Sequence, residues 1–419
     1  MKKSLLISAI LLATAISTTS QNLAVIKVVF DGTTASVSMP STMTDVDYTV
    51  NGANVEITSG TSTAEYAYEL SGSSDDGSLT LTGNYKLTLR LNGLNLTSQN
   101  RPAIDIECGK RIAVELIDGT VNTLSDAEGG FHKATLYFTG HPEFSGSGQL
   151  NVTGKTKHAI SAKEYLEIKK GTGSINILSA AGDGIHCGKG KVANENNYFK
   201  MSGGTVNISN IGGDGIDSDD FGVVNISDGS LSINISGDDN TGIKADSIMT
   251  ISGGHININV SGKGSDALSS AYSTTISGGD IHLLITGDGS KGIVSKNSSS
   301  TVLNGGECTV SGGTIEILAT GGLLTTDTNE KKCRGLNADK TFTQTGGEIT
   351  IYAYGSDSSG YKSDVESKLE GGQMTVHKAP WSHNPYDYQY DMSSWVTVKE
   401  NDAMISDYSE YAVGAFSGE

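Results

Sequence analysis

A repeat of about 25 residues constrains this chain more than any other feature of its sequence, because a fixed period in the range of about 20–50 residues indicates stacked copies of one supersecondary unit. Four turns that contain glycine recur at equal spacing, beginning at Gly203, Asp228, Gly253 and Gly278. A stack of this kind grows by adding units, so the 419 residues need not divide into several globular domains.

Each unit repeats the same internal pattern. After the Gly turn, as in residues 205–208, apolar and polar residues alternate, which is typical of a half-buried strand. A turn rich in Gly and Asp, a second short run and a third run ending in Ile-Ser complete the unit. Three strands in a unit of this length predict one coil of a parallel β-helix. From residue 148 onward, nine coils share one register, with apolar pairs at Leu150/Val152, Ile175/Ile177, Val206/Ile208, Leu231/Ile233, Ile256/Ile258, Ile281/Leu283, Ile315/Ile317, Ile349/Ile351 and Met374/Val376.

The residues between these apolar pairs should form one outward polar stripe, because side chains alternate between the two faces of a strand. This stripe is either a solvated sheet face or a surface that contacts polysaccharide. Its members are Asn151, Asn176, Asn207, Ser232, Asn257, His282, Glu316, Thr350 and Thr375.

The two ends of the chain differ from the repeats. Residues 1–21 resemble a signal peptide, with Lys2 and Lys3 before an apolar run that is too short to span a bilayer. Residues 22–78 contain hairpin signals such as Asp31-Gly32 and Asn51-Gly52, and we expect them to form an N-terminal β cap. The β-helix is expected over residues 79–378. The aromatic-rich segment 379–419 is expected to cover the open end, or to stack Trp381 and Tyr388 on sugar rings.

Charge and cysteine content limit the possible functions. The net charge is −18 and only four residues are Arg, so the basic surface needed to bind a nucleic acid backbone is missing. No segment is apolar enough for a transmembrane span, and we expect a secreted, cell-surface or periplasmic protein, for which a monomer is favoured. The four cysteines have no metal-ligand or redox spacing. At least two of them are expected to be unpaired core residues.

An array of aspartates carries the predicted chemistry. Equivalent positions on adjacent coils are about 4.8 Å apart, so carboxylates on neighbouring coils can meet at one calcium ion, whose oxygen ligands lie at about 2.4 Å. The alternative is that Asp merely suits these turns. The residues predicted to bind calcium are Asp183, Asp214, Asp217, Asp219, Asp238, Asp239, Asp246 and Asp266.

This coil pattern resembles exported carbohydrate-binding proteins of anaerobic bacteria. The resemblance is carried by stretches such as Gly182-Asp183-Gly184-Ile185, Gly213-Asp214-Gly215-Ile216 and Gly242-Ile243-Lys244-Ala245-Asp246, within about residues 80–375. It implies a right-handed β-helix like that of pectate lyases, with bound calcium and a plant-type polysaccharide ligand such as cellulose or polygalacturonate. In later coils Lys291, Arg334 and Ser359 replace the Asp.

Three classes of function remain open. The first is a calcium-dependent, non-catalytic protein that binds polysaccharide, with Asn207, Asn257, Trp381 and Tyr388 as contact residues. The second is a pectate-lyase-like enzyme, in which Lys244 is the one candidate base, or a hydrolase that uses paired carboxylates. In the simpler interpretation, Lys244 is a solvent-facing strand residue paired with Asp. The third class is a structural or adhesive surface protein. The sequence favours the first.

Overall fold

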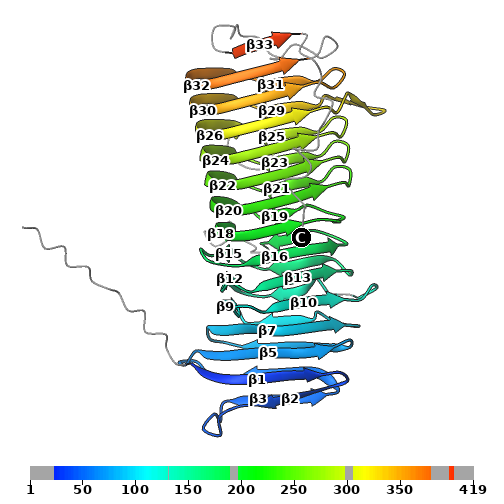
Figure 1. The fold of residues 1–419 in the computed structure, drawn as a ribbon, viewed down its shortest axis with the longest axis vertical. Coiled ribbons are helices and arrows are strands. Elements are labelled where there is room, and N and C mark those ends of the chain that lie inside the picture. Colours follow the sequence, from blue (N-terminus) through cyan, green and yellow to red (C-terminus); the bar gives the residue numbers. More distant parts are fainter. Residues whose placement is uncertain (1–22, 131, 189–196, 298–304, 379–395, 401–419) are drawn as a thin grey trace, which may run out of the picture.

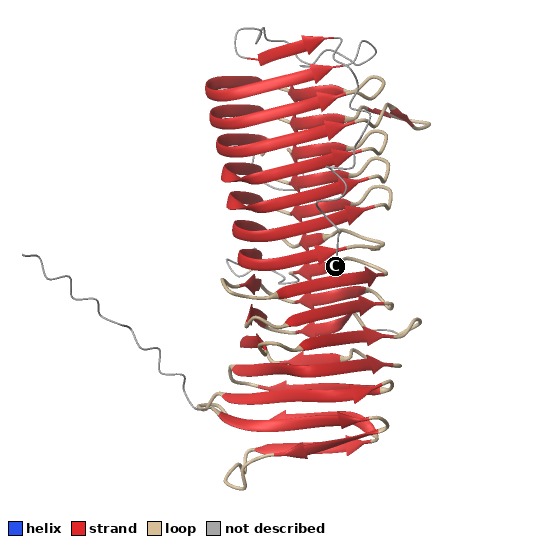
Figure 2. Ribbon diagram, viewed as in Figure 1, coloured by secondary structure: helices blue, strands red, loops and turns tan. Residues whose placement is uncertain are grey.

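The molecule is a tall stack of short β-strands. The computed structural model describes residues 23–130, 132–188, 197–297, 305–378 and 396–400, and every regular element that it assigns there is a strand. The strands form one sheet of 18 strands and one of 13, both running along the long axis of the molecule (Figures 1 and 2). A separate hairpin consists of β27 (Leu324–Thr325) and β28 (Glu330–Lys331).

The strand bounds are as follows. The 18-stranded sheet contains β1 (Ala24–Asp31), β2 (Thr34–Ser38), β5 (Tyr66–Ser74), β7 (Leu87–Ser98), β9 (Arg111–Leu116), β10 (Val121–Asp126), β12 (His141–Ser145), β13 (Gln149–Gly154), β15 (Leu166–Ile168), β16 (Ser174–Ala180), β18 (Tyr198–Ile208), β20 (Val223–Ile235), β22 (Ile248–Val260), β24 (Ser273–Ile285), β26 (Glu307–Ala319), β30 (Thr341–Ala353), β32 (Glu366–Lys378) and β33 (Val396–Glu400). The 13-stranded sheet contains β3 (Val46–Asn51), β4 (Ala53–Ser59), β6 (Gly77–Gly83), β8 (Ile104–Glu107), β11 (Ala134–Phe138), β14 (His158–Ala162), β17 (Ile185–Cys187), β19 (Ile216–Ser218), β21 (Thr241–Ala245), β23 (Asp266–Ser270), β25 (Lys291–Ser295), β29 (Arg334–Ala338) and β31 (Ser359–Ser363).

The predicted register of the nine apolar pairs is confirmed. Leu150 pairs with Ile175, Ile175 with Val206, and the series continues in parallel through Ile349 and Met374. The intervening polar residues pair in the same way, from Asn151 to Thr375. Period-2 alternation fixes this register, because a slip by one residue would turn the apolar set to the outside.

The predicted fold class, a right-handed parallel β-helix of three-strand coils with separate caps, is not the arrangement that the structure shows. Both large sheets are mixed, since antiparallel hairpins β1–β2 and β3–β4 belong to them together with parallel strands. Three separate strands per repeat occur only between Ile104 and Ala180. From β17 onward each repeat contributes one short strand to the 13-stranded sheet and one long strand to the 18-stranded sheet.

The Gly pairs explain why the strand count differs from the prediction. In β22, Gly254 has a φ of +91° and the pairing to β24 shifts register between Ile251 and His255, yet the strand continues. A Cβ at Gly253 would lie 2.3 Å from the carbonyl oxygen of Ser227 on the adjoining strand. The Gly pair is thus a bulge inside one strand, where backbones approach closely, and not a turn between two strands.

The N-terminal segment forms the first rungs of the stack. Both hairpins predicted from Asp31-Gly32 and Asn51-Gly52 are present, as β1–β2 and β3–β4. However, β1 also pairs in parallel with β5, and β4 pairs in parallel with β6, so parallel stacking begins before residue 78. The C-terminal strand β33 adds one more parallel neighbour to β32. The predicted signal peptide, Trp381 and Tyr388 lie outside the described residues.

The space between the two sheets is filled by one continuous apolar core. Leu, Ile and Val side chains from successive rungs are buried in it, and so are the four cysteines. All four cysteines are free thiols, which confirms the prediction that at least two are unpaired. Among the described residues, no helix has the length and apolar character needed to cross a membrane.

Candidate functional site

The 13-stranded sheet carries three rows of polar side chains that point away from the core, with one residue per rung. Because neighbouring rungs are about 4.8 Å apart, side chains in a row can contact each other. The first row is His158, Asp183, Asp214, Thr241 and Asp266. The second row is Ser161, His186, Asp217, Lys244 and Ser269. The third row includes Lys163, Asp219 and Asp246.

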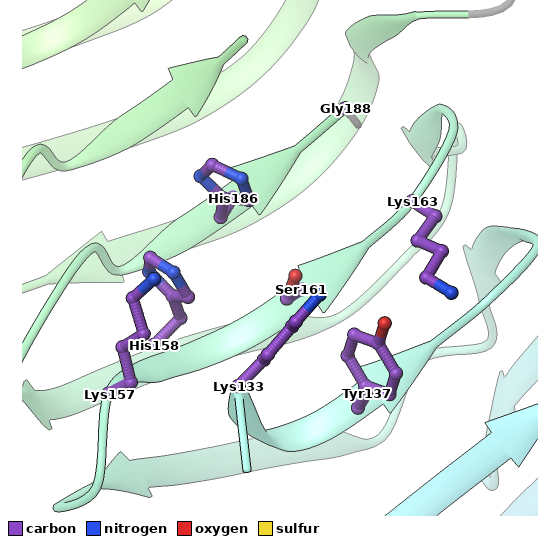
Figure 3. A pocket seen from close by; sticks show the side chains of 8 residues that line it. All are labelled: Lys133, Tyr137, Lys157, His158, Ser161, Lys163, His186 and Gly188. Carbon is purple, nitrogen blue, oxygen red and sulfur yellow. The ribbon is translucent and has the colours of Figure 1, made fainter. Parts of the chain in front are cut away.

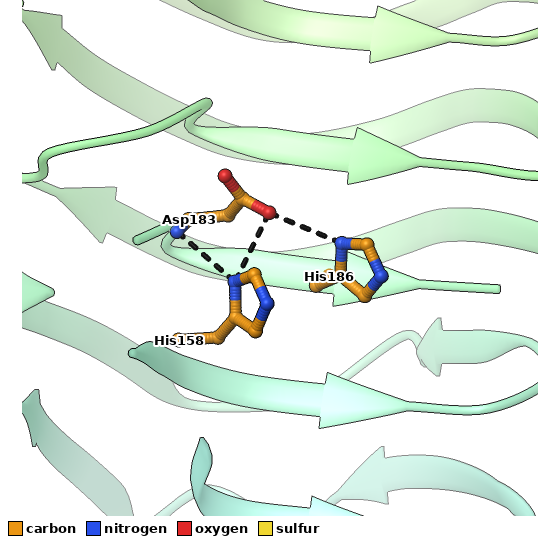
Figure 4. A group of neighbouring side chains, drawn as sticks. All are labelled: His158, Asp183 and His186. Carbon is orange, nitrogen blue, oxygen red and sulfur yellow. Dashed lines mark hydrogen bonds and ion pairs between the residues drawn. The ribbon is translucent and has the colours of Figure 1, made fainter. Parts of the chain in front are cut away.

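At one end of these rows lies an imidazole–carboxylate cluster, formed by His158, Asp183 and His186 (Figure 4). Oδ2 of Asp183 lies 3.0 Å from Nδ1 of His158 and 3.1 Å from Nδ1 of His186. The backbone N–H of Asp183 donates to Nδ1 of His158 at 3.1 Å. The two imidazole rings stack with their centroids 4.5 Å apart. Burial alone would raise the pKa of Asp183, but its bonds to the two histidines lower it well below its usual range.

The two histidines differ in charge. Nδ1 of His186 also lies 3.4 Å from Oδ2 of Asp217. Burial disfavours the imidazolium form, but the hydrogen bonds to Asp183 and Asp217 outweigh it and raise the pKa of His186 to about 9. Burial lowers the pKa of His158 despite its contact with Asp183. At pH 7 His186 therefore carries the positive charge of this cluster, and His158 is neutral.

One rung further on, Lys244 takes the central place among the predicted calcium ligands. Its Nζ lies 3.1 Å from Oδ1 of Asp217, 3.5 Å from Oδ2 of Asp214 and 3.9 Å from Oδ1 of Asp246. Burial alone would lower the pKa of Lys244, but Asp217 and Asp214 raise it. The interpretation of Lys244 as a strand residue paired with Asp is confirmed. A lysine held in its charged form by carboxylates cannot accept a proton as a base.

The third row holds a pair of coupled carboxylates. Asp219 and Asp246 are equivalent residues on adjoining rungs, and both are partly exposed. Burial and a hydrogen bond with Asp219 raise the pKa of Asp246 to about 7, whereas that bond lowers the pKa of Asp219 despite burial. Burial also raises the pKa of Asp214 to about 6, against the opposing effect of Lys244. Two carboxylates that share one proton in this way form a site that a divalent cation can occupy instead.

The predicted calcium ligands therefore fall into three groups. Asp219 and Asp246 offer oxygen atoms on neighbouring rungs, whereas the adjacent Oδ1 of Asp217 is buried and forms an ion pair with Lys244. Asp183 and Asp214 are engaged by the histidines and by backbone N–H groups. The remaining members lie elsewhere. Asp266 lies 3.1 Å from Nζ of Lys296, Asp239 is 2.9 Å from Nζ of Lys331, and Asp238 accepts a backbone bond from Lys263 in an exposed turn. The oxygen chemistry of calcium is thus best matched at Asp219 and Asp246.

A hollow adjoins the two histidines of the cluster, which both line it (Figure 3). Tyr137, Ser161 and His186 occupy equivalent positions on three successive rungs, and the small side chain of Ser161 leaves space between the two rings. The hollow is lined by Lys133, Tyr137, Lys157, His158, Ser161, Lys163, His186 and Gly188. Its charged lining is basic, in contrast to the rows of aspartates beside it.

On the 18-stranded sheet, the polar stripe forms a ladder of amides. Asn176 donates to Asn151 at 2.9 Å, and Asn207 donates to Asn176 at 2.8 Å. Asn257 is 9% exposed and bonds to Nε2 of His255 at 2.9 Å. The predicted contact residue Asn207 is thus held within the ladder. A second group that could hold a metal ion, His255, Asp280 and His282, lies further along this stripe.

Sequence reasoning did not find the histidines or the basic hollow. One signal was available for His186, which occupies the same place after Gly184-Ile185 that Asp217 occupies after Gly215-Ile216. Lys157 and Lys163 lie in a part of the chain without that motif. Only strand pairing shows that they adjoin His186.

Two comparisons with known proteins gave a match. A family model described as carbohydrate-binding domain-containing protein matches residues 51–312, which is more than half of the chain. A solved structure described as the polysaccharide lyase-like protein from C. thermocellum, gadolinium derivative, is 17% identical. That comparison covers 89% of this chain and 99% of the other, with a TM-score of 0.30. No curated protein matches the chain.

Proposed function

The chain belongs to the carbohydrate-binding domain-containing family, and on this premise we propose that it is an exported protein that binds polysaccharide without cleaving it. The extent of the family match supports this proposal most directly. Residues 51–312 include the described rungs from β4 into β26, whose outer faces present polar side chains at regular spacing. Such rows can contact successive sugar units of one extended glycan.

The state of Lys244 supports binding without cleavage. A lyase needs a base that removes a proton from the sugar ring. Lys244 was the one candidate for this role, and three carboxylates within 3.9 Å of its Nζ keep it protonated. Its role here is to neutralise the aspartates around it.

Calcium is part of the proposal. Asp219 and Asp246 would hold the ion, because they offer carboxylate oxygens on adjacent rungs and share a proton that the ion can replace. When bound, calcium would neutralise these two aspartates and could bridge them to an acidic sugar. We propose a plant-type polysaccharide as the ligand, which is either polygalacturonate (pectin) or cellulose.

The test combines binding with product detection. The mature protein is incubated with polygalacturonate or cellulose, with calcium or with excess chelator, and its retention on insoluble polysaccharide is measured. Unsaturated product is followed by absorbance in the same samples. We expect retention without product. Failure to bind any of these glycans would contradict the proposal.

An enzyme is the second candidate, and one observation favours it. Asp214 and Asp246, whose pKa values are raised to about 6 and about 7, lie in one cluster, and such shifted carboxylates are common at catalytic sites. A hydrolase could use them as acid and base. Release of reducing ends from the glycan, abolished by Asp246→Asn, would establish this alternative and exclude a purely binding role.

A further inference from the structure

The hollow beside the histidine cluster is open to solvent, and it is lined by lysines although the chain as a whole is acidic. Its floor is Ser161, which is 4% exposed and lies between Tyr137 on one rung and His186 on the next (Figure 3). Lys157 and Lys163 border it at the two ends of β14, and Lys133 lines the same side. The chain as a whole carries 47 acidic residues against 29 Lys and Arg, so this concentration of cations goes against its composition.

Two lysines of the hollow, Lys157 and Lys163, are placed to contact a ligand. Within the part of the chain that the structure describes, Lys157 and Lys163 form no close ion pair with a carboxylate, and Lys163 has only a longer-range electrostatic interaction with Asp105. This separates them from lysines such as Lys244 and Lys296, which contact aspartates. His186 lines the hollow from the rung next to Ser161.

The acidic groups on adjoining rungs do not cancel this charge. Asp183 is already engaged by both histidines. Asp105 is the rung neighbour of Tyr137; burial raises its pKa to about 6 and Lys163 opposes this shift, so this single carboxylate faces more than one lysine. The hollow thus presents the ammonium groups of two lysines and the Ser161 hydroxyl around one space, beside the ring of His186, and such donors suit an oxyanion.

We propose that this hollow is a subsite for the anionic group of an acidic glycan, with Lys157, Lys163 and His186 contacting the carboxylate of a uronate unit directly. The proposal rests on the proposed function and narrows it to acidic polysaccharides. It requires no calcium, unlike a bridge through Asp219 and Asp246. The Tyr137 ring at the edge of the hollow supplies an apolar surface beside the sugar.

The test measures affinity for a short oligogalacturonate in excess chelator at low ionic strength, by calorimetry on the full-length mature protein. The double variant Lys157→Ala/Lys163→Ala is compared with Lys110→Ala/Lys263→Ala, which removes the same charge from exposed positions outside the hollow. The first pair should weaken binding about tenfold or more, because each lysine can form a charge-assisted hydrogen bond with the carboxylate. The control pair should change affinity less than about twofold.

Two further arms distinguish steric and chemical explanations. Ser161→Leu fills the hollow without changing charge, and it should weaken binding to a similar degree. A methyl-esterified oligogalacturonate should bind with the same affinity to the wild type and to the lysine variant, because its carboxylate charge is absent.

The outcomes separate this inference from the proposed function. Equal losses in the two double variants, or unchanged affinity in Ser161→Leu, would overturn the subsite, even if the wild type binds polysaccharide. Strong binding of a sulfated glycan with no binding of the uronate would overturn the assignment to a carboxylate. If the wild type binds neither acidic nor neutral glycans, the proposed function itself fails.

Discussion

Two adjoining parts of one sheet face differ in whether their charged side chains are paired within the protein. Around β19 and β21, Asp214, Asp217 and Asp246 surround Lys244, so the charges are neutralised inside the protein. Around β14, Lys157 and Lys163 border a hollow, and neither forms a close ion pair with a carboxylate among the described residues. His186 lies between the two regions and contacts Asp183 and Asp217 while lining the hollow.

The difference shows that the net charge of the chain does not predict the charge of a local part of its surface. A chain with a charge of −18 is expected to repel an acidic polymer. A rigid stack nevertheless places equivalent positions of successive repeats in fixed rows, so cations can gather on one group of rungs and carboxylates on another. The carboxylates of the acidic rungs then stabilise the fold or hold an ion, and the lysines of the basic rungs contact a ligand.

Removing the central cation of the acidic region should have the largest effect on stability. In Lys244→Met, three carboxylates lose a shared partner, and we expect the free energy of unfolding to fall by about 2 kcal/mol, after allowance for the partial exposure of Lys244. Denaturant unfolding measures this loss. Lys263→Ala, an exposed lysine in a turn, is the control and should change stability by less than about 0.5 kcal/mol. Equal effects of the two variants would contradict the picture of an internally neutralised cluster.

The histidine between the two regions should make stability depend on pH. The pKa of His186 is raised to about 9 by Asp183 and Asp217, whereas in the unfolded chain it is about 6.5. Its stabilising contribution is therefore complete below about pH 6.5 and is lost as the pH rises through about 9. We expect the wild type to lose about 2 kcal/mol over this window. His186→Gln should show a flatter profile in urea unfolding from pH 6.5 to 9.5, and an unchanged slope would contradict the assignment.

Asp246 provides a smaller test, in which the substitution should increase stability. Its pKa is raised to about 7, so ionising it costs stability as the pH rises from about 4 through 7. In chelator at pH 8, Asp246→Asn should be about 1 kcal/mol more stable than the wild type. Addition of calcium should raise the melting temperature of the wild type and not that of the variant. Equal stabilisation of both proteins by calcium would place the ion elsewhere.

The amide ladder should give the smallest effect. Asn176→Ala removes one bond to Asn151 and one from Asn207 on the partly exposed stripe. We expect a loss of about 0.5–1 kcal/mol in the free energy of unfolding. Thr350→Ala on the same stripe serves as the control. A loss above about 3 kcal/mol in Asn176→Ala would show that the ladder is a main source of stability.

The sequence predicted the strand register well and the detailed fold less well. Alternation around Ile256 and Ile258 identifies the buried face, and the period of two leaves little freedom in pairing. The sequence could not show that the bulge at Gly254 joins two runs of alternating residues into one strand. A glycine with positive φ is equally suited to a turn and to a bulge. Nor could the sequence exclude a separate cap, since the parallel pairing of β1 with β5 joins segments with no repeat signature.

The same limit applies to the site. The aspartate rows follow from copies of one motif at equal spacing, so residues such as Asp217 could be placed in advance. Lys244 could also be interpreted as a partner of Asp, whereas His186, which contacts Asp183 and Asp217, could be identified only once neighbouring rungs were aligned. The repeats that contain residues 188–197 and 297–307 are longer than the regular unit, and counting along the chain then no longer gives the spatial neighbour.

The most direct test of this account is lysine footprinting of the full-length mature protein with an acetylating reagent, in chelator, with and without oligogalacturonate. Mass spectrometry compares Lys157 and Lys163 with the exposed controls Lys110 and Lys263. The account predicts that the ligand protects the first two lysines and leaves the labelling of the controls unchanged. Labelling of Lys157 and Lys163 that is unaffected by a bound ligand would contradict it.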